Sequence, residues 1–287
     1  MIARRLMCRG VRDLALEEVV LSPPNPGKVL VRTLLSAVSV SSELGVVEGR
    51  VSAKYPVGLG YQTLGTVEGT RVVTTLGHAS AGIVRADRCL EVPSHVPDRV
   101  ALAAILGEET HKGIRKVAPE QHERVLVAGA GLLGLLTIFN LTRRGLQVSV
   151  IEPDPRRRTL AKEFGAVPFS GGDFDVGFEC SASPDGFAEL LAKLRPGGRA
   201  CVLSDGNWGA LTLPRAFHER ELTVTASSDG EDYAAYAEWL WNHPDEKLTR
   251  LFEQTISPHE LPEAYRRLTV FPRPISVAVD WADFDPK

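Results

Sequence analysis

The 287-residue chain has only four cysteines, and they are widely spaced at Cys8, Cys89, Cys180 and Cys201. No two of them form a Cys-x-x-Cys pair, and their spacing fits neither a zinc knuckle nor a disulfide framework. Cys180 and Cys201 each lie in an apolar run. We therefore expect these two side chains in the hydrophobic core.

The chain also lacks long apolar runs and a large excess of charge. No stretch approaches the roughly 18 apolar residues of a membrane span, and the N-terminal arginines are not followed by the apolar segment of a secretory signal. The formal net charge is −3, and Arg156-Arg157-Arg158 is the one basic cluster of note. Such a chain has no field that would recruit nucleic acid or an anionic membrane. We expect a cytoplasmic protein with neither of these partners.

Residues 1 to about 118 have the pattern of a β-rich domain. Short strands are predicted at 29–33 and 71–75, and glycines interrupt the region throughout. Helical periodicity is clear only at about 98–117. This composition is typical of a small barrel with irregular loops.

From about residue 119, strand patterns and helix patterns alternate. Asp154-Pro155 and Ser183-Pro184 each offer a helix cap followed by a proline in the first turn. This alternation predicts a doubly wound parallel sheet. The predicted strands are 125–128, 147–151, 175–180, 199–203 and 222–226, and the predicted helices are 132–144, 154–165, 183–194 and 231–242, with a turn at 196–198.

The last residues hold one predicted helix, 258–268, and one predicted strand, 275–279. We expect them to return to the first domain. The predicted domains are therefore 1–118 with 257–287, and 119–256.

A G-x-G-x-x-G sequence joins the first strand of the second domain to its helix. Its residues are Gly129, Ala130, Gly131, Leu132, Leu133 and Gly134. In this context the first glycine permits a tight turn, the second lets the backbone approach a pyrophosphate, and the third allows close packing of helix on strand. The helix N-terminus offers free N–H groups to the phosphates. A glycine-rich turn without a ligand is the alternative reading.

Further candidate cofactor ligands follow the later strands. Glu152 lies 18 residues after Gly134, where an acidic residue binds the ribose hydroxyls in dinucleotide folds. Its carboxylate would repel a 2′-phosphate, so NAD is expected rather than NADP. Arginine binds phosphate well, and the arginine triplet, in which Arg157 is a predicted cofactor contact, argues the other way. Ser181, Ala182 and Ser204 follow two further strands, at the sheet edge where ligands bind.

The segments 152–166 and 183–198 resemble the medium-chain dehydrogenase/reductase superfamily. In the first, Glu152 is followed by a helix that ends in Gly165-Ala166, and the second contains Leu-Arg-Pro-Gly-Gly. The resemblance implies an α/β fold, with a GroES-like β-barrel domain followed by a doubly wound, parallel-sheet Rossmann domain and a short C-terminal return. Dimers are common in this superfamily, so the resemblance also implies a possible homodimer.

Two segments of the first domain are similar to the short subgroup around bacteriochlorophyllide a dehydrogenase. The stretch 36–43, followed by Gly49-Arg50, is similar to that group's "SGIS-x-GTE…GR" segment. The stretch 55–65 is similar to its "YP…PGYE-x-x-G" segment.

The chain departs from zinc-dependent members of this superfamily at the positions that hold the metal. Ser41 or a neighbour replaces the cysteine ligand, and Tyr61-Gln62 replaces the His-Glu pair. A hydroxyl, a phenol and an amide are poor ligands for Zn²⁺. The lobe with four cysteines that holds a structural zinc is also absent. We expect no zinc and no other metal site.

Three residues are candidates for the chemistry. Tyr61 replaces a metal ligand, and its phenol could donate a proton, although a tyrosine packed in the barrel fits equally. Glu43 and His111 could orient it or resupply the proton, and Glu43 could also be a solvated loop residue. Thr110 matches a family position that lines the cofactor. His78 follows a strand and could reach the cleft, but a satisfied loop histidine is the favoured prediction.

The leading functional interpretation is a zinc-independent NAD(P)(H)-dependent oxidoreductase that acts on the alcohol/ketone pair of a small or medium organic substrate. A second interpretation is a quinone or enone reductase that adds hydride to a C=C bond. A third, of another class, is a dinucleotide-binding sensor or non-catalytic homologue.

Overall fold

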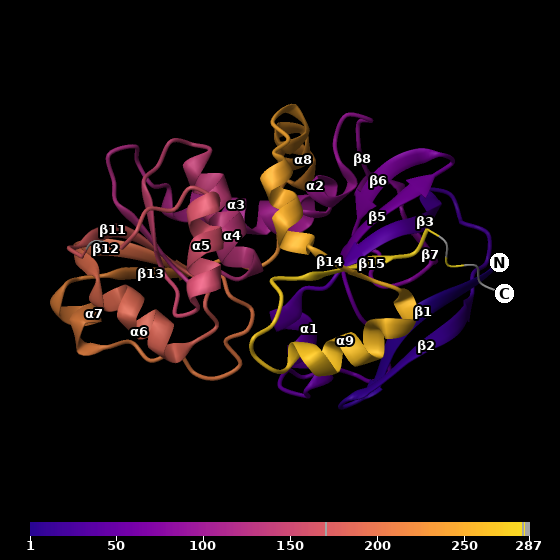
Figure 1. Cartoon of the computed structure of the whole chain (residues 1–287), viewed down its shortest axis with the longest axis horizontal. Helices are drawn as coiled ribbons and strands as arrows, with labels where there is room; N and C mark the ends of the chain where they lie inside the picture. Colours follow the sequence, from indigo (N-terminus) through magenta and orange to yellow (C-terminus); the bar gives the residue numbers. More distant parts are fainter. Residues whose placement is uncertain (170, 283, 285–287) are drawn as a thin grey trace. The chain divides into compact units, whose positions relative to one another are not determined.

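The computed structural model describes residues 1–169, 171–282 and 284. The chain forms two compact units: Met1–Ile105 with Tyr233–Lys287, and Leu106–Asp232. The N-terminal strands, indigo in Figure 1, and the yellow segment around β15 both belong to the first unit. These bounds differ from the predicted 118/119 and 256/257. In the part of the chain that the structure describes, no helix is long and apolar enough to cross a membrane.

The first unit is built on two sheets. One has the strand order β2-β1-β4, and the other has the order β14-β15-β3-β5-β6-β8, with β7 paired on β3. Among the described residues, the strands of this unit pair antiparallel, except that β14 is parallel to β15. The strands are β1 (Ile2–Gly10), β2 (Asp13–Val20), β3 (Lys28–Ala37), β4 (Val57–Gly58), β5 (Gln62–Val67), β6 (Thr70–Thr74), β7 (Ala81–Arg85), β8 (Leu90–Glu91), β14 (Gln254–Ile256) and β15 (Val277–Asp280).

Helices complete the first unit, and two differ from the sequence prediction. No helix was predicted at α1. The helix predicted at 98–117 is two helices, α2 and α3 (Ala104–Val117), that break at Ala103. In α9 the buried residues recur at helical spacing, so one face packs on the unit. The helices are α1 (Val40–Val47), α2 (Asp98–Leu102), α8 (Tyr233–Asn242) and α9 (Leu261–Leu268), with 3-10 turns η1 (Ala86–Arg88), η2 (Glu246–Phe252) and η3 (Pro258–Glu260).

Helix α8 follows the last strand of the second unit in sequence but packs in the first unit. Trp241 of α8 donates its indole N–H to the carbonyl of Glu91 at 2.9 Å. Its own carbonyl lies 2.9 Å from Nε2 of His95. The prediction that this helix belongs to the strand-helix alternation of the second unit was wrong. Its hydrogen-bond partners are Glu91 of β8 and His95, which both lie in the first unit.

The second unit confirms the predicted parallel sheet. Its strand order is β10-β9-β11-β12-β13, and every pair is parallel. In Figure 1, α4 and α5 lie on one face of this sheet and α6 and α7 on the other. The elements are α3 (Ala104–Val117), β9 (Val125–Ala128), α4 (Leu132–Thr142), β10 (Val148–Ile151), α5 (Pro155–Glu163), β11 (Phe174–Glu179), α6 (Pro184–Ala192), β12 (Leu194–Val202), α7 (Arg215–Glu219) and β13 (Thr223–Ala226).

The two predicted helix caps are confirmed. The side chain of Asp154 accepts the N–H of Arg156 at 2.9 Å, and that of Ser183 accepts the N–H of Gly186 at 3.3 Å. The predicted turn at 196–198 is instead an irregularity inside β12. Phe174 of β11 pairs with Leu194 but Val176 pairs with Arg199, so the residues between them bulge from the ladder.

The sheet has five strands where a six-stranded dinucleotide fold has the order 3-2-1-4-5-6. Beyond β10, the one pairing among the described residues that extends the ladder is a parallel bridge between Val167 and Ser149. Among the described residues no helix or strand lies between α5 and β11. The third strand and its crossover helix are thus missing, because only ten residues separate Glu163 from Phe174.

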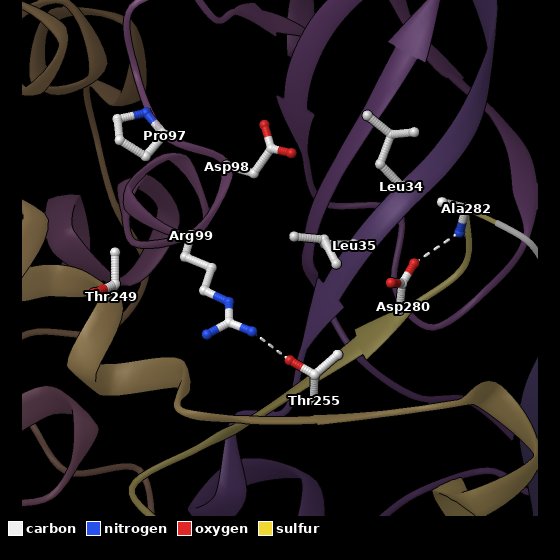
Figure 2. Close-up of a pocket in the computed structure, with 9 residues that line it drawn as sticks. All are labelled: Leu34, Leu35, Pro97, Asp98, Arg99, Thr249, Thr255, Asp280 and Ala282. Carbon is white, nitrogen blue, oxygen red and sulfur yellow. Dashed lines mark hydrogen bonds between the residues drawn. The ribbon is translucent and has the colours of Figure 1, made fainter.

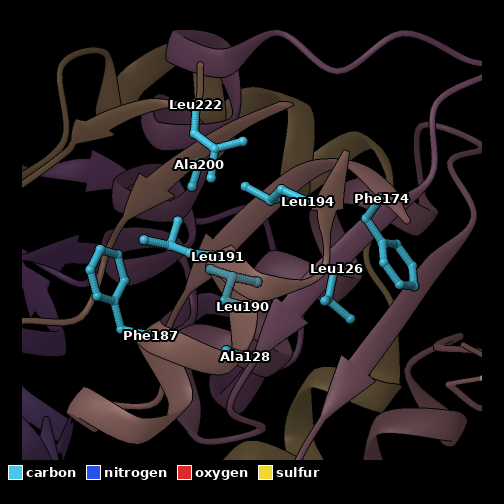
Figure 3. Packing of buried hydrophobic residues seen from close by; sticks show 9 residues of the cluster. All are labelled: Leu126, Ala128, Phe174, Phe187, Leu190, Leu191, Leu194, Ala200 and Leu222. Atoms are coloured by element: carbon cyan, nitrogen blue, oxygen red, sulfur yellow. The ribbon is translucent and has the colours of Figure 1, made fainter. Parts of the chain in front are cut away.

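An apolar cluster holds α6 on this sheet. Phe187, Leu190 and Leu191 of α6 pack with residues of β9, β11 and β12 (Figure 3). The strand residues Leu126 and Ala128 are fully buried. Burial at roughly 25 cal/mol per Å² of apolar surface makes this cluster a main stabiliser of the unit. It includes Ala128, the last residue of β9, so it packs directly beneath the start of the glycine loop.

Candidate functional site

The glycine loop follows β9 at the point where the sheet reverses its winding. Strands β10 and β11 flank β9, and such a switch point is where ligands bind in open α/β sheets. Gly129 has φ +92°, and a Cβ there would lie 2.6 Å from Cα of Ser181. A Cβ at Gly134 would lie 2.0 Å from the carbonyl oxygen of Gly129. Both positions therefore require glycine for the fold itself.

Gly131 differs from these two glycines because a Cβ there would make no close contact. The nearest atom to a Cβ built there would be Nη1 of Arg157, at 3.9 Å. Gly131 is also the N-cap of α4 and gives no side-chain hydrogen bond to the first turn. The loop therefore leaves room beside the free N–H groups of a helix, with a guanidinium close by. This cradle fits the pyrophosphate of a dinucleotide.

Glu152, the predicted ribose ligand, is held against the same loop. Its Oε2 accepts the N–H of Ala130 at 2.8 Å, and its Oε1 accepts the N–H of Asp154 at 2.9 Å. The three arginines that follow diverge. Arg156 pairs with Asp154 at 2.8 Å and Arg158 donates to the carbonyl of Glu152 at 2.7 Å, whereas Arg157 lies beside Gly131.

A buried carboxylate at the end of β11 was missed by the sequence analysis. Glu179 is fully buried, and its Oε1 accepts the N–H and hydroxyl of Ser181 at 2.7 and 2.6 Å and the N–H of Ala182 at 3.0 Å. Its Oε2 accepts from Nδ2 of Asn207 at 2.6 Å. Glu179 thus ties together the loops that follow β11 and β12. The available signal was a carboxylate at the last position of an apolar strand.

Two other predicted cofactor residues, Thr110 and Ser204, form hydrogen bonds to groups of the second unit itself. Thr110 is fully buried, donates to the carbonyl of Gly107 at 2.9 Å and accepts from Nδ2 of Asn140 at 2.8 Å. Its hydroxyl therefore joins α3 to α4. Ser204 follows β12 and accepts the N–H of Gly206 at 3.3 Å. The structure brings Ser204 to the carboxyl edge of the sheet but turns Thr110 toward α4.

His111 lies in an ionic cluster on α3. Its Nδ1 lies 3.0 Å from Oε2 of Glu108 and 2.7 Å from Nη1 of Arg115. Burial alone raises the pKa of Glu108, but hydrogen bonds from His111, from Arg115 and from the N–H groups of Asp232 and Glu231 outweigh it and lower the pKa to about 2. Nδ1 of His111 is thus engaged by Glu108 and Arg115.

The neighbouring carboxyl shifts in the opposite direction. Burial, followed by the charges of Asp229 and Asp205, raises the pKa of Glu109 to about 8. Asp205 follows β12 and Asp229 follows β13, so these carboxyls gather at the carboxyl edge of the sheet. Glu109 is therefore largely neutral at pH 7 and can donate a hydrogen bond there.

In the first unit, Tyr61 faces two serines at the start of α1. Its hydroxyl donates to Oγ of Ser39 at 2.7 Å and lies 3.1 Å from Oγ of Ser42, which donates to Oγ of Ser39 at 2.9 Å. The ring is partly buried. Three hydroxyl groups therefore meet at one point, and the sequence analysis singled out only Tyr61.

Glu43 is buried, with 3% of its surface exposed, so the alternative of a solvated loop residue is wrong. Its Oε2 lies 3.1 Å from Nε2 of His78 and accepts a short hydrogen bond from the hydroxyl of Tyr265. His78 also contacts Oγ of Ser36 through Nδ1, at 2.7 Å. The prediction of a satisfied histidine is confirmed, although the ring is fully buried.

Ser41, Tyr61 and Gln62 are the residues that the sequence resemblance aligns with metal ligands. Ser41 lies in the first turn of α1, and Gln62 is buried with its amide lacking a hydrogen-bond partner. Over the described ranges, no three His, Cys, Asp or Glu side chains are grouped to hold a metal ion. The donor chemistry of Tyr61 and Gln62 does not fit Zn²⁺.

A separate pocket of about 430 Å³ lies in the first unit (Figure 2). Asp98 and Arg99 of α2 line it, together with Thr255 and Asp280. Its polar groups are already paired, since Arg99 donates to Thr255 at 2.6 Å and Asp98 pairs with Arg71 at 2.8 Å. Neither Glu43 nor Tyr61 is among its lining residues, so we do not place the site there.

No protein-family model matches the sequence, and no curated protein matches it. Solved structures do match the fold. L-idonate 5-dehydrogenase from Escherichia coli has a TM-score of 0.88 at 19% identity, covering 98% of both chains. Acetophenone reductase from Geotrichum candidum, in complex with NAD, has a TM-score of 0.87 at 18% identity, also covering 98% of both chains. 2R,3R-butanediol dehydrogenase from Bacillus subtilis has a TM-score of 0.84 at 18% identity, over 97% of this chain and 99% of that one. The chain therefore has the two-domain fold of these dehydrogenases, a barrel-type domain with a parallel-sheet Rossmann domain.

Proposed function

We propose that this protein is an oxidoreductase that transfers hydride between a nicotinamide dinucleotide and the alcohol/carbonyl pair of a small or medium organic molecule. We further propose that it works without zinc. The observation that carries the proposal is the glycine loop, in which Gly129 and Gly134 are required by packing whereas Gly131 is open beside Arg157. The fold shared with dehydrogenases, one of them in complex with NAD, supports the same assignment.

The second unit would bind the cofactor through few groups. The N–H groups of the first turn of α4 and the guanidinium of Arg157 would hold the pyrophosphate, and Glu152 would hold the adenosine ribose. Ser181, Ala182 and Ser204 would line the carboxyl edge. A bound NADH would supply hydride to the carbonyl carbon of the substrate.

The first unit would supply the proton. The carbonyl oxygen gains an electron pair when hydride arrives, so it needs a positioned donor. We assign this role to the hydroxyl of Tyr61, which Ser39 and Ser42 orient. A phenol has an unperturbed pKa near 10 and is therefore a protonated donor at neutral pH.

Zinc independence is proposed from the chemistry of the replaced ligands. Zn²⁺ would need thiolate, imidazole or carboxylate donors, and Tyr61 and Gln62 offer a phenol and an amide. Elemental analysis after dialysis without chelator should therefore find far less than one zinc per chain. About one zinc per chain, lost together with activity on chelation, would contradict this part of the proposal.

The activity itself is tested by a substrate panel. Purified protein is assayed with NADH and with NADPH against aliphatic ketones, aromatic ketones, aldehydes, enones and quinones. We expect carbonyl reduction and the reverse oxidation of the product alcohol. Turnover only of enones or quinones would favour a C=C reductase. Tight NADH binding without turnover of any compound would favour a dinucleotide sensor and overturn the proposed activity.

A further inference from the structure

A chain of buried hydrogen bonds runs from the C-terminal segment to α1. The indole N–H of Trp281 donates to Oγ of Ser36 at 2.9 Å, and Ser36 lies 2.7 Å from Nδ1 of His78. On its other side, Nε2 of His78 lies 3.1 Å from Oε2 of Glu43. All four side chains have at most 3% of their surface exposed. This series of hydrogen bonds is therefore shielded from solvent along its whole length.

Glu43 is the point at which this chain meets α1. Besides His78, its carboxylate accepts the hydroxyl of Tyr265 and the backbone N–H of Ser39, the latter at 2.6 Å. Burial, together with the charge of Glu43, raises the pKa of Tyr265 well above its ordinary value, so this phenol stays protonated and remains a donor. A buried carboxylate held by several donors fixes the groups around it, because leaving any of them unpaired is costly.

Ser39 connects the buried chain with the candidate proton donor. Its N–H is bound by Glu43, while its hydroxyl accepts from Tyr61 at 2.7 Å. Ser39 therefore lies between the carboxylate of Glu43 and the hydroxyl of Tyr61, and Glu43 can act on that hydroxyl through the position of Ser39.

The residues that form this series of hydrogen bonds come from distant parts of the sequence. Tyr265 lies 222 residues after Glu43, and Trp281 lies 245 residues after Ser36. Helix α9 delivers Tyr265 from its buried face, and Trp281 directly follows β15, which pairs with β3. The C-terminal segment therefore contacts the segment 36–43 at both of its ends, with Trp281 bound to Ser36 and Tyr265 bound to Glu43.

We propose that Tyr265 and Trp281 of the C-terminal return are positioning residues for Tyr61, acting through Glu43 and Ser39. The catalytic consequence rests on the function proposed above, because it requires Tyr61 to be the proton donor. The positioning itself can be measured in the full-length protein without any turnover.

The decisive measurement is NMR of protein labelled at the ζ carbon of its five tyrosines. The Tyr61 signal is identified by its loss in Tyr61→Phe. In Tyr265→Phe, which removes only a hydroxyl, the Tyr61 signal should move by more than its linewidth. Ser36→Ala should move it in the same direction by a smaller amount, and it provides the test if Tyr265→Phe does not fold. An unmoved Tyr61 signal in a folded variant would overturn the proposal.

Tyr55→Phe is the matched control. Tyr55 also donates to the region of α1, through the carbonyl of Val46 at 2.5 Å, but it lies outside the chain that ends at Ser39. Its substitution should leave the Tyr61 signal in place. Movement of the Tyr61 signal in this control as large as that in Tyr265→Phe would show a general response of α1 and would overturn the specific path.

Kinetics give a second readout, with the panel carbonyl that the parent protein reduces fastest. Tyr265→Phe should lower kcat about tenfold, since small misplacement of a reacting group slows the step, and should leave the KM for NADH unchanged. Combined with Tyr61→Phe it should cause no further loss, because both changes act through one hydroxyl. Multiplied losses would overturn the proposal. A moved Tyr61 signal in a protein that reduces nothing would instead contradict only the proposed function.

Discussion

The two units differ in how their candidate site residues are distributed along the chain. In the second unit, the loop Gly129–Gly134 and the carboxylate of Glu152 lie within 24 consecutive residues, and the proposed binding groups of this loop are mostly backbone N–H groups. In the first unit, Glu43, Tyr61, His78 and Tyr265 come from four separate segments and act through side chains.

The contrast between backbone groups and buried side chains matches the two proposed roles, which are cofactor binding in the second unit and proton transfer in the first. A site made of backbone N–H groups tolerates most side chains but requires glycine at fixed places, so its sequence pattern is short and local. A site made of buried side chains depends on contacts that form only when remote segments meet. Changes in the second unit should therefore weaken cofactor binding, and changes in the first should slow the chemistry.

The largest expected effect tests the first unit. Tyr61→Phe should lower kcat by about 10²–10⁴-fold, the usual range for a positioned proton donor. The NADH dissociation constant should hardly change, because the cofactor groups lie in the second unit. Steady-state kinetics and fluorescence titration with NADH measure both. Equal kcat in the variant and the parent would remove Tyr61 from the mechanism.

An acid-stability experiment tests the second unit. The pKa of Glu108 is lowered from 4.5 to about 2 in the folded protein, so the unfolded state binds more protons between these values. Stability should therefore fall as the pH drops from about 4.5 to 2, by at most about 3 kcal/mol from this fully buried group. Glu108→Gln should be less stable at pH 7 and should flatten this slope. Urea unfolding at several pH values measures it, and an unchanged slope would contradict the assignment.

The glycine loop offers a matched pair of substitutions. Gly134→Ala places a Cβ 2.0 Å from the carbonyl oxygen of Gly129 and should cost about 1–3 kcal/mol of unfolding free energy. Gly131→Ala meets nothing closer than 3.9 Å, so it should leave stability within about 0.5 kcal/mol. It should nevertheless weaken NADH binding by about tenfold, or roughly 1.4 kcal/mol. Unchanged NADH affinity in Gly131→Ala would place the pyrophosphate elsewhere.

The smallest expected effect concerns the choice of cofactor. Glu152 would repel a 2′-phosphate, so the protein should bind NADH about tenfold more tightly than NADPH, well below the roughly 4 kcal/mol of an unrelaxed charge pair at 4 Å. Glu152→Gln should reduce this preference, and Arg157 would then favour the phosphate. Titration of both proteins with both cofactors measures the ratio. Tighter binding of NADPH by the parent would reverse the assignment.

Local signals accounted for much of the second unit. The caps at Asp154 and Ser183, the parallel strands and the glycine loop all follow from neighbouring residues, and the structure has them where they were predicted. The turn predicted at 196–198 was wrong because strand pairing with β11 extends β12 through it as a bulge. The predicted sheet was correct in type, although its missing third strand was not foreseen.

The sequence by itself determined the order of barrel and Rossmann domains and the position of the glycine loop, because these depend on residue type at short spacing. Only the tertiary structure decided that Glu43 is buried against His78 and Tyr265, that α8 packs in the first unit, and that Thr110 turns toward α4. Burial and hydrogen-bond partners belong to contacts between segments remote in the chain, and no local pattern of residues specifies which segments meet.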